Sequence, residues 1–201
     1  MTTAKHDILQ RIRAALNDHP APPPIPRNYH HTLPEGTDLV TLFAQRAADY
    51  RATITRTPAT NLPHAIAEAA AGRRLATPTD IPAEWTTNLD TITDNPPLTN
   101  HQLDHTDGVL TGAATAIALT GTIILDTGPT QGRRTLTLLP DYHLCVLHTH
   151  QIVGTLTEAL TRLDPTRPQT WISGPSATSD IELNRIEGVH GPRTLHILIA
   201  E

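Results

Sequence analysis

The spacing of hydrophobic residues predicts an isolated helix near the start of the chain. Ile8, Ile12 and Leu16 recur at helical spacing, so an amphipathic helix is expected over about residues 4–17. The proline-rich residues 19–26 that follow cannot be helical and are expected to be extended. A helix this short does not bury its apolar face alone. It therefore docks on a partner chain or on the main domain, or packs locally as an arm, and the sequence leaves these alternatives open.

From residue 37 onward, helical and strand patterns alternate. Thr37 or Asp38 is the expected N-cap of the first helix of the main domain. Helices are expected over 38–52, 62–71 (ended by Gly72), 99–105, 151–163 and 180–187. Strands are expected over 74–77, 89–93, 109–112, 116–126, 142–148, 169–173 and 194–200.

Several of these strands are apolar on both faces, a pattern typical of a parallel sheet that is covered on both sides. The predicted fold is therefore a three-layer α/β fold with a mostly parallel sheet. Residues 1–36 form an N-terminal helical arm with a proline-rich tether, and residues 37–201 form the α/β domain.

Composition narrows the functional classes. A length of 201 residues suits one domain with an extension, and an aromatic content of 3% means that the core is aliphatic. A formal charge of -5 argues against nucleic acid as a partner, since phosphate binding needs clustered Lys and Arg. No signal peptide and no run of about 18 apolar residues for a transmembrane segment is found, so a cytoplasmic location is expected.

Two residue types occur only once. Cys145 is the single cysteine, so the chain supplies no internal disulfide, no cysteine-based zinc site and no set of ligands for an iron–sulfur cluster. It lies in an apolar strand and is expected to be a buried structural residue. Lys5 is the single lysine, which excludes a P-loop and argues against Schiff-base chemistry.

The sharpest local motif runs from a strand through a Gly-Pro turn into a hydroxyl-rich loop and an expected helix. Backbone N–H groups and hydroxyls beside a helix start favour an anion or phosphate site. The candidate ligand-binding residues of this loop are Gly174, Pro175, Ser176, Thr178 and Asp180. The alternative is that the hydroxyls only satisfy the turn, with Ser179 and Glu182 forming a capping box.

Further candidates lie in glycine-containing segments. His190, Gly191 and Arg193 form an irregular loop in which the histidine could act as an acid or base and the arginine could hold an anion. Glycines next to threonines at strand ends suggest close approach of a ligand or of another backbone. These candidates are Thr111, Gly112, Thr120, Gly121 and Thr122. His148 and His150 share a strand face, but no third ligand is placed by the sequence, so no metal site is expected.

The motifs together carry a family resemblance. The stretches concerned are residues 107–112, 120–123, 132–134, 138–143, 173–181 and 188–193, together with the N-terminal helix and residues 43–52. In these stretches the chain resembles the LutC/YkgG family of lactate-utilisation proteins, which contain a LUD domain. The resemblance implies an α/β fold related to the NagB/RpiA/CoA-transferase-like superfamily. It also implies a role in oxidising lactate to pyruvate beside iron–sulfur partner proteins.

One departure from the family pattern affects the functional expectation. Where the family usually reads Ala-Glu-Thr-Gly, this chain has Leu119 in place of the glutamate. The predicted function is an accessory, non-redox subunit of a lactate-oxidising system that binds a small anionic ligand, partner proteins or both. No cofactor is expected in this chain, iron–sulfur clusters are expected in its partners, and no residue is assigned as catalytic.

The alternative is a stand-alone enzyme of the cyclo-ligase or transferase type with a phosphate-binding loop. In that case Asp180 would orient the loop, His190 would act as acid or base, and Arg193 would neutralise charge. Whether the chain is an enzyme stays open at this point.

Overall fold

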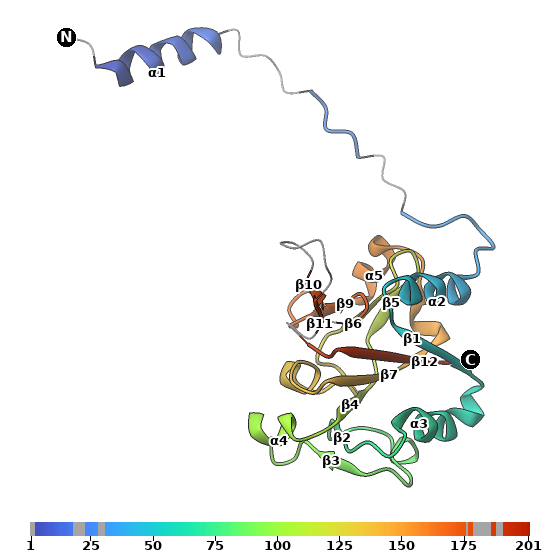
Figure 1. The fold of residues 1–201 in the computed structure, drawn as a ribbon. Helices are drawn as coiled ribbons and strands as arrows, with labels where there is room; N and C mark the ends of the chain where they lie inside the picture. The colour runs from blue at the N-terminus through green and yellow to red at the C-terminus, as the bar shows by residue number, and fades with distance from the viewer. Residues whose placement is uncertain (1–2, 18–22, 28–30, 176, 179–185, 188–190) are drawn as a thin grey trace. The chain divides into compact units, whose positions relative to one another are not determined.

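The structure is a computed structural model that describes residues 3–17, 23–27, 31–175, 177–178, 186–187 and 191–201 (Figure 1). The chain divides into two compact units, Met1–His30 and His31–Glu201. Within the described ranges, no helix is both long enough and apolar enough to cross a membrane.

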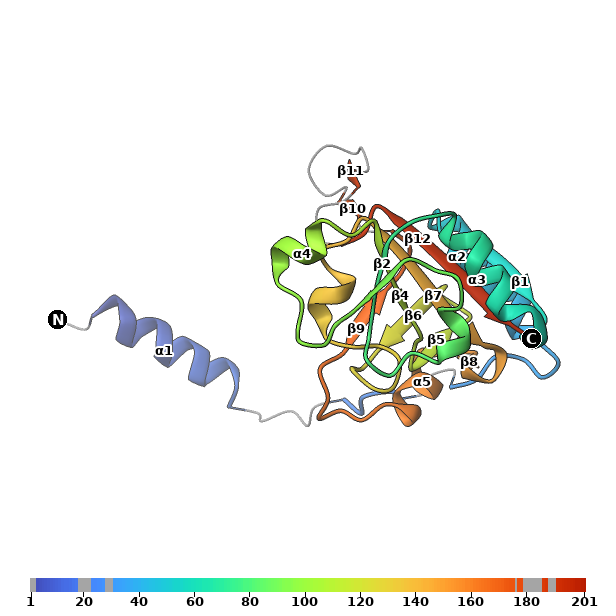
Figure 2. The same cartoon turned by 90° about the horizontal axis from the view of Figure 1, so that it is seen from below.

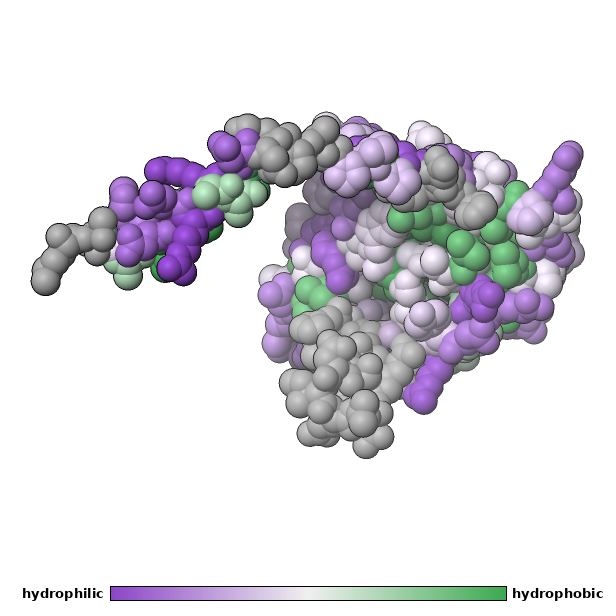
Figure 3. All heavy atoms as spheres, turned by 90° about the horizontal axis from the view of Figure 1, so that it is seen from above, coloured by the Kyte–Doolittle hydropathy of each residue, from purple (hydrophilic) through white to green (hydrophobic). Residues whose placement is uncertain are grey.

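The first unit contains the helix that the spacing of apolar residues predicts, α1 (Ala4–Ala15). Ile8, Leu9, Ile12 and Leu16 are between 40% and 59% exposed, and no residue of α1 is buried. In the space-filling view of Figure 3, the helix shows green apolar residues among purple polar ones. Its apolar face therefore has no partner among the residues of this unit that the structure describes.

A six-stranded sheet forms the centre of the second unit. In sheet order its strands are β1 (Thr53–Thr57), β12 (Thr194–Ala200), β7 (Tyr142–His148), β4 (Gly108–Thr111), β2 (Leu75–Thr77) and β3 (Thr91–Thr93). Every neighbouring pair is parallel. The central strands β4 and β7 are almost entirely buried, as expected for a parallel sheet covered on both faces. The predicted α/β class with a mostly parallel sheet is confirmed.

One face of this sheet is covered by a helix. The helix is α3 (Leu62–Ala70), whose Ile66 packs in one cluster with Leu144 and Leu198 of the sheet. The helix ends as predicted: Ala71 adopts a left-handed conformation, and Gly72 follows with φ +74°.

The opposite face is covered by a helix and a second sheet. The helix is α2 (Leu39–Asp49), and Asp38 is its N-cap, because its carboxylate accepts a hydrogen bond from the Thr41 N–H at 3.0 Å. The second sheet contains, in order, β8 (Ile152–Val153), β5 (Thr115–Ile117), β6 (Thr122–Leu125) and β9 (Thr170–Ile172). Figure 2 shows α3 on one side of the main sheet and the smaller sheet on the other, consistent with their separate apolar clusters.

Shorter elements complete the unit. They are α4 (Asn100–Asp104), α5 (Leu156–Arg162), the hairpin strands β10 (Ala177–Thr178) and β11 (Ile186–Glu187), and 3-10 turns at Ala59–Asn61, Ala83–Trp85, Arg134–Thr137 and Thr149–Gln151. Helix α5 packs on the outer face of the smaller sheet, where Ala159 and Leu163 contact the cluster around Ile124 and Val153.

Two predicted elements in this covering layer are wrong. The predicted strand 116–126 is a hairpin of β5 and β6, because the turn that contains Gly121 interrupts it. The predicted helix 151–163 begins as β8 and becomes helical only after Thr155, which caps α5. Of the four apolar residues that share one face at helical spacing in this stretch, Ile152 and Leu163 are buried, whereas Leu156 and Leu160 are exposed. Ala159 is the buried residue within α5 itself.

Two further differences concern local pairing. The strand β1 was not predicted, because Thr53, Thr55 and Thr57 make it look polar, although it pairs with β12 along its whole length. The predicted helix 180–187 is wrong at its end, because residues 186–187 form β11, which pairs antiparallel with β10. Residues 180–185 lie outside the described part of the chain.

The hairpin turn is fitted closely to α2 at Gly121. This residue has φ +63°, and a Cβ atom there would lie 2.6 Å from the carbonyl carbon of Arg46 and even nearer to the backbone nitrogen of Ala47. Because these are backbone atoms of a helix, they cannot move aside as a flexible side chain would. Gly121 therefore sets how closely the second sheet approaches α2.

We predict that Gly121→Ala destabilises the protein by about 2–4 kcal/mol, because left-handed strain and a backbone clash add together. The control is Gly72→Ala, since Gly72 has φ +74° but open space around its Cβ position. That variant should lose only about 1 kcal/mol. Urea unfolding measures the free energy of unfolding of each variant. Equal losses of this free energy in the two variants would contradict the close contact between Gly121 and the backbone of α2.

Candidate functional site

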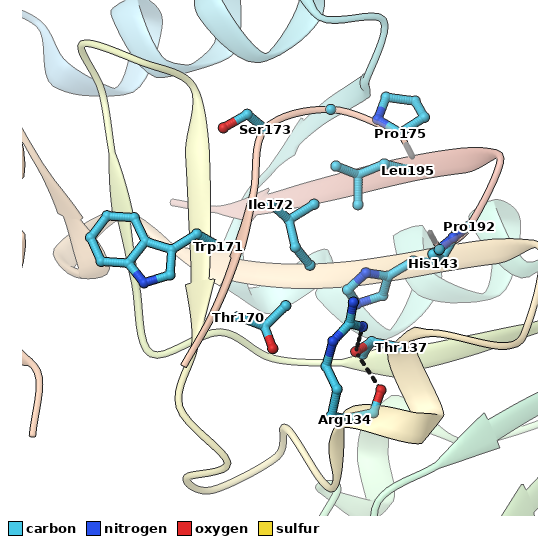
Figure 4. A pocket seen from close by; sticks show the side chains of 12 residues that line it. Arg134, Thr137, His143, Thr170, Trp171, Ile172, Ser173, Pro175, Pro192 and Leu195 are labelled. Carbon is cyan, nitrogen blue, oxygen red and sulfur yellow. Dashed lines mark hydrogen bonds between the residues drawn. The ribbon is translucent and has the colours of Figure 1, made fainter. Parts of the chain in front are cut away.

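A pocket of about 230 Å³ opens between the two sheets (Figure 4). It lies where β9, the edge strand of the smaller sheet, faces the amino-terminal parts of β7 and β12. Its lining residues are Arg134, Thr137, His143, Thr170, Trp171, Ile172, Ser173, Gly174, Pro175, Gly191, Pro192 and Leu195.

The floor of the pocket follows from the alternation of side chains along the strands. Tyr142 and Leu144 of β7 belong to the cluster under α3, so His143 between them points to the opposite face. His143 pairs in register with Leu195 of β12, which places these two side chains next to each other beneath β9. Both are almost completely buried, at 1% and 2% exposure.

His143 is a buried neutral histidine with one unused nitrogen. Its Nε2 atom lies 2.7 Å from the Thr111 hydroxyl, which occupies one side of the ring. Its Nδ1 atom is buried and has no hydrogen-bond partner among the described residues. Burial, helped by the nearby Arg134 charge, lowers the pKa of His143 to about 3, so the ring is uncharged at neutral pH. A buried polar atom left unpaired costs about 1–3 kcal/mol.

Arg134 brings a positive charge to the same pocket. It begins the 3-10 turn Arg134–Thr137, and its guanidinium donates to the Thr137 hydroxyl at 3.1 Å. Figure 4 shows this guanidinium beside the His143 ring. No carboxylate of the described residues lies within ion-pair distance of it, although Asp94 pairs with Arg133 and Asp141 with Arg193. Partial burial lowers the pKa of Arg134, but an arginine remains charged at neutral pH.

Three of the sequence-predicted residues line this pocket. They are Gly174, Pro175 and Gly191. Two others reach its rim through a chain of hydroxyl groups: Thr120 bonds to Thr122 at 2.7 Å, and Thr122 bonds to Ser173 at 2.8 Å. The structure thus brings the β5–β6 turn and the segment after β9 to one side of the pocket.

The other sequence-predicted residues are placed differently. Thr111 lies behind His143 as its hydrogen-bond partner. Gly112 packs against the side chain of Thr130, and Gly121 packs against α2. Arg193 is exposed and donates to Asp141 at 3.1 Å, and it does not line the pocket. Thr178 belongs to β10, whereas Ser176, Asp180 and His190 lie outside the described residues.

Sequence reasoning missed the two residues that give the pocket its chemical character, Arg134 and His143. Both lie in stretches that carry the family resemblance, but neither forms part of a recognised motif. A histidine inside a strand that is apolar on both faces is the one local signal, because a buried imidazole needs a partner for each nitrogen.

The remaining candidates for metal or nucleophile chemistry do not gather into a site. The rings of His148 and His150 stack with centroids 5.5 Å apart. In the described segments, no three His, Cys, Asp or Glu side chains lie close enough to hold a metal ion. Cys145 is fully buried, and burial raises the pKa of its thiol to about 12, which makes it a poor nucleophile.

The turn that carries Arg134 is fixed by the preceding residue. Arg133 donates two hydrogen bonds to Asp94, at 2.8 and 3.0 Å, and a third at 2.5 Å to the Leu98 carbonyl. The Leu98 N–H also donates to Asp94 at 2.7 Å. Burial alone would raise the pKa of Asp94, but the hydrogen bonds from Arg133 and Leu98 outweigh it and lower that pKa.

We predict that Arg133→Ala destabilises the protein by about 1–3 kcal/mol at pH 7, because it leaves the nearly buried Asp94 unpaired. A carboxylate whose pKa is lowered by folding stabilises the protein above its ordinary pKa of 3.8, and this contribution is lost as the pH falls through the folded-state pKa. The difference in free energy of unfolding between wild type and variant, measured by urea unfolding, should therefore be larger at pH 7 than near pH 3.

The control for this prediction is Arg74→Ala, which removes an exposed contact of 3.8 Å to Asp90. An exposed pair of this kind contributes about 0–1 kcal/mol. The role given to the Arg133–Asp94 pair would be contradicted if Arg133→Ala lost no more unfolding free energy than Arg74→Ala. It would also be contradicted if the loss for Arg133→Ala did not change with pH.

Comparisons with known proteins agree with the motifs. A family model described as the LUD domain matches residues 89–200. Lactate utilization protein C of Deinococcus radiodurans is 44% identical over 205 residues, which cover 99% of this chain and 92% of that protein. Lactate utilization protein C of an Exiguobacterium species is 35% identical over 99 residues, which cover 45% of this chain and 43% of that protein.

A solved structure supports the same relationship. The crystal structure of a DUF162 family protein from Deinococcus radiodurans matches with a TM-score of 0.70 and 41% sequence identity. The match covers 82% of this chain and 97% of that chain. The family model spans more than half of this chain, and the first relative matches it almost from end to end. The chain therefore belongs to the LUD domain family, as its sequence motifs predict.

Proposed function

We propose that this chain is an accessory, non-redox component of a lactate-utilisation system and that it binds a small anionic ligand in the pocket beside Arg134. The observation that carries the proposal is its 44% identity, over nearly its whole length, with a protein named Lactate utilization protein C. The electron carriers of such a system would reside in iron–sulfur partner proteins.

The charge of the pocket supports an anionic ligand. Arg134 contributes a cation that is not neutralised by any described carboxylate, and the neighbouring His143 ring is uncharged. Thr170 and Ser173 also line the pocket, and the Ser173 hydroxyl bonds to Thr122 at its rim. The pocket volume of about 230 Å³ lies below the range of about 300–1,000 Å³ that is typical of sites for drug-sized ligands. A small acid suits this volume better than a nucleotide does.

Two residues support an accessory role over an electron-transferring or covalent one. Cys145 is the only cysteine, so the chain does not supply the several thiolates that an iron–sulfur cluster requires. Leu119, at the position where the family usually has glutamate, is exposed in the β5–β6 turn and does not line the pocket. A carboxylate that could act as a base or nucleophile is therefore missing from this turn.

We predict that deleting the gene from its host impairs growth on lactate as sole carbon source and leaves growth on glucose unchanged. The wild-type chain should restore growth, and Arg134→Gln should not, because it removes the cation of the pocket. Arg46→Gln is the matched control, since Arg46 is exposed and makes only a 3.8 Å contact to Asp49.

Normal growth of the deletion strain on lactate would overturn the proposed role. The competing function, a phosphate-using enzyme, makes a different prediction for the purified chain. In that case ATP or an acyl-CoA at saturating concentration would raise the melting temperature. We expect no such rise, because the pocket is small and no lysine is among the described residues that line it to hold a triphosphate.

A further inference from the structure

We propose that the apolar face of α1 docks on an exposed apolar patch of a second copy of this chain, so that two copies exchange their N-terminal arms. This outer patch consists of Leu156 and Leu160 of α5 and Trp171 of β9. Eleven large hydrophobic side chains are exposed in the part of the chain that the structure describes, and seven of them belong to α1, its C-cap or the outer patch. The inference does not depend on the proposed function.

The helix α1 needs a surface that covers its apolar face. Its 12 residues are near the minimum length at which an isolated helix is even marginally stable in water. Ile8, Ile12 and Leu16 follow one another at intervals of four residues, the spacing by which amphipathic helices dock on apolar surfaces. Arg11 and Arg13 lie on either side of this face, since a helix has 3.6 residues per turn. The helix therefore suits a surface that is apolar and carries negative charge nearby.

The outer patch lies on the face of the smaller sheet that α5 covers. Trp171 pairs in register with Ile124, whose side chain packs with Leu163 in the cluster beneath α5, so Trp171 points to the same face. Leu156 and Leu160 are one helical turn apart on α5 and are 50% and 55% exposed. Trp171 is 40% exposed. Adjoining exposed apolar side chains of this kind are typical of protein interaction sites.

The course of the tether favours a second copy over the same chain as the partner of α1. The carbonyl of His31 accepts a hydrogen bond from the Thr155 hydroxyl at 2.6 Å, directly before Leu156, so the tether meets the α/β domain beside the outer patch. Residues 20–26 include five prolines. A proline-rich segment is a semi-rigid spacer of about 3 Å per residue, so this one extends over about 20 Å. Such a spacer opposes the return of α1 to the patch at the tether's own base.

The distribution of charge also favours a second copy. Residues 1–30 contain four basic and two acidic residues, a net charge of +2, so with a total of -5 the remaining residues carry -7. Opposite charges attract the arm of one copy to the α/β domain of another. An anionic membrane is the other surface that a basic amphipathic helix can cover, but it would repel the acidic domain. Each copy supplies one arm and one patch, so the exchange closes as a symmetric dimer.

Docking on the outer patch places the helix of the second copy next to the ligand pocket. Trp171 belongs to both, since it also lines the pocket together with its neighbours in β9, Thr170 and Ile172. A helix that covers Trp171 therefore restrains the strand that forms one wall of the pocket.

The first test is the mass of the full-length chain in solution, measured by light scattering over a series of concentrations. We expect a dimer that dissociates on dilution. Ile12→Asp and Leu160→Asp should each raise the Kd of the dimer at least about tenfold, because each change acts at both contacts of a symmetric dimer. Ile25→Asp is the matched control, since Ile25 is 72% exposed in the tether and belongs to neither surface. The melting temperature of each variant verifies that it is folded.

Cysteine pairing then identifies the surfaces that meet. Cys145 is the only cysteine and is fully buried, so it gives no background reaction. A mixture of the separate variants Ile12→Cys and Leu160→Cys should form, on mild oxidation, a disulfide between two chains that joins positions 12 and 160. A mixture of Ile25→Cys and Leu160→Cys is the control and should form far less of the linked product.

The outcomes distinguish arm exchange from the other partners of α1. A monomer at every concentration would overturn it, whether α1 then covers its own chain, binds vesicles of anionic phospholipid or does neither. A dimer that Ile12→Asp and Leu160→Asp leave unchanged would overturn it as well, because the interface would then lie elsewhere. Growth of the deletion strain on lactate tests the accessory role alone.

Discussion

Burial of β7 and β12 on both faces is the constraint on which the other layers depend. Leu144 and Val146 face α3, whereas Cys145 and Leu147 face α2 and the smaller sheet. Removing each such aliphatic side chain from water stabilises the fold by about 1.5–3 kcal/mol, so both faces must be covered. With aromatic residues at 3% of the chain, the interior consists of many close aliphatic contacts, and small residues such as Gly121 determine how closely the layers approach.

The pocket lies where this covering ends. The smaller sheet packs over the carboxyl-terminal halves of β7 and β12, and its edge strand β9 leaves a space above their amino-terminal ends. Ligands of open α/β sheets usually bind beyond the carboxyl ends of the parallel strands. Here the described pocket lies on the face of the sheet, between two sheets, and a polar residue, His143, replaces the aliphatic one that the strand pattern would otherwise place there.

Much of the fold was predictable because its strands are locally distinctive. The apolar runs of β7 and β12 match their observed bounds, and α2 and α3 follow from helical spacing and their caps. Strand structure in 116–126 and 169–173 was predictable, but the second sheet as a whole was not. Its edge strand β8 has only two residues, and Ile152 also fits the helical spacing of Leu156 and Leu160. A pairing partner such as β5 is far from β8 in sequence, so no local pattern reveals it.

The site was predictable only in part, for a related reason. Glycines and prolines mark turns, and Gly174, Pro175 and Gly191 do line the pocket. The same kind of signal also marked Gly121, whose role in the structure is close packing against α2. His143 carries no such mark, since only the tertiary structure shows that one of its nitrogens has a partner and that the other has none among the described residues. The ligand-binding roles of the individual residues remain predictions.

A crystal structure of the chain grown with lactate tests the central claim most directly. The account predicts one lactate molecule between the two sheets, with its carboxylate within hydrogen-bond distance of the Arg134 guanidinium. A pocket that stays empty at saturating lactate, or a lactate bound with its carboxylate directed away from Arg134, would contradict it.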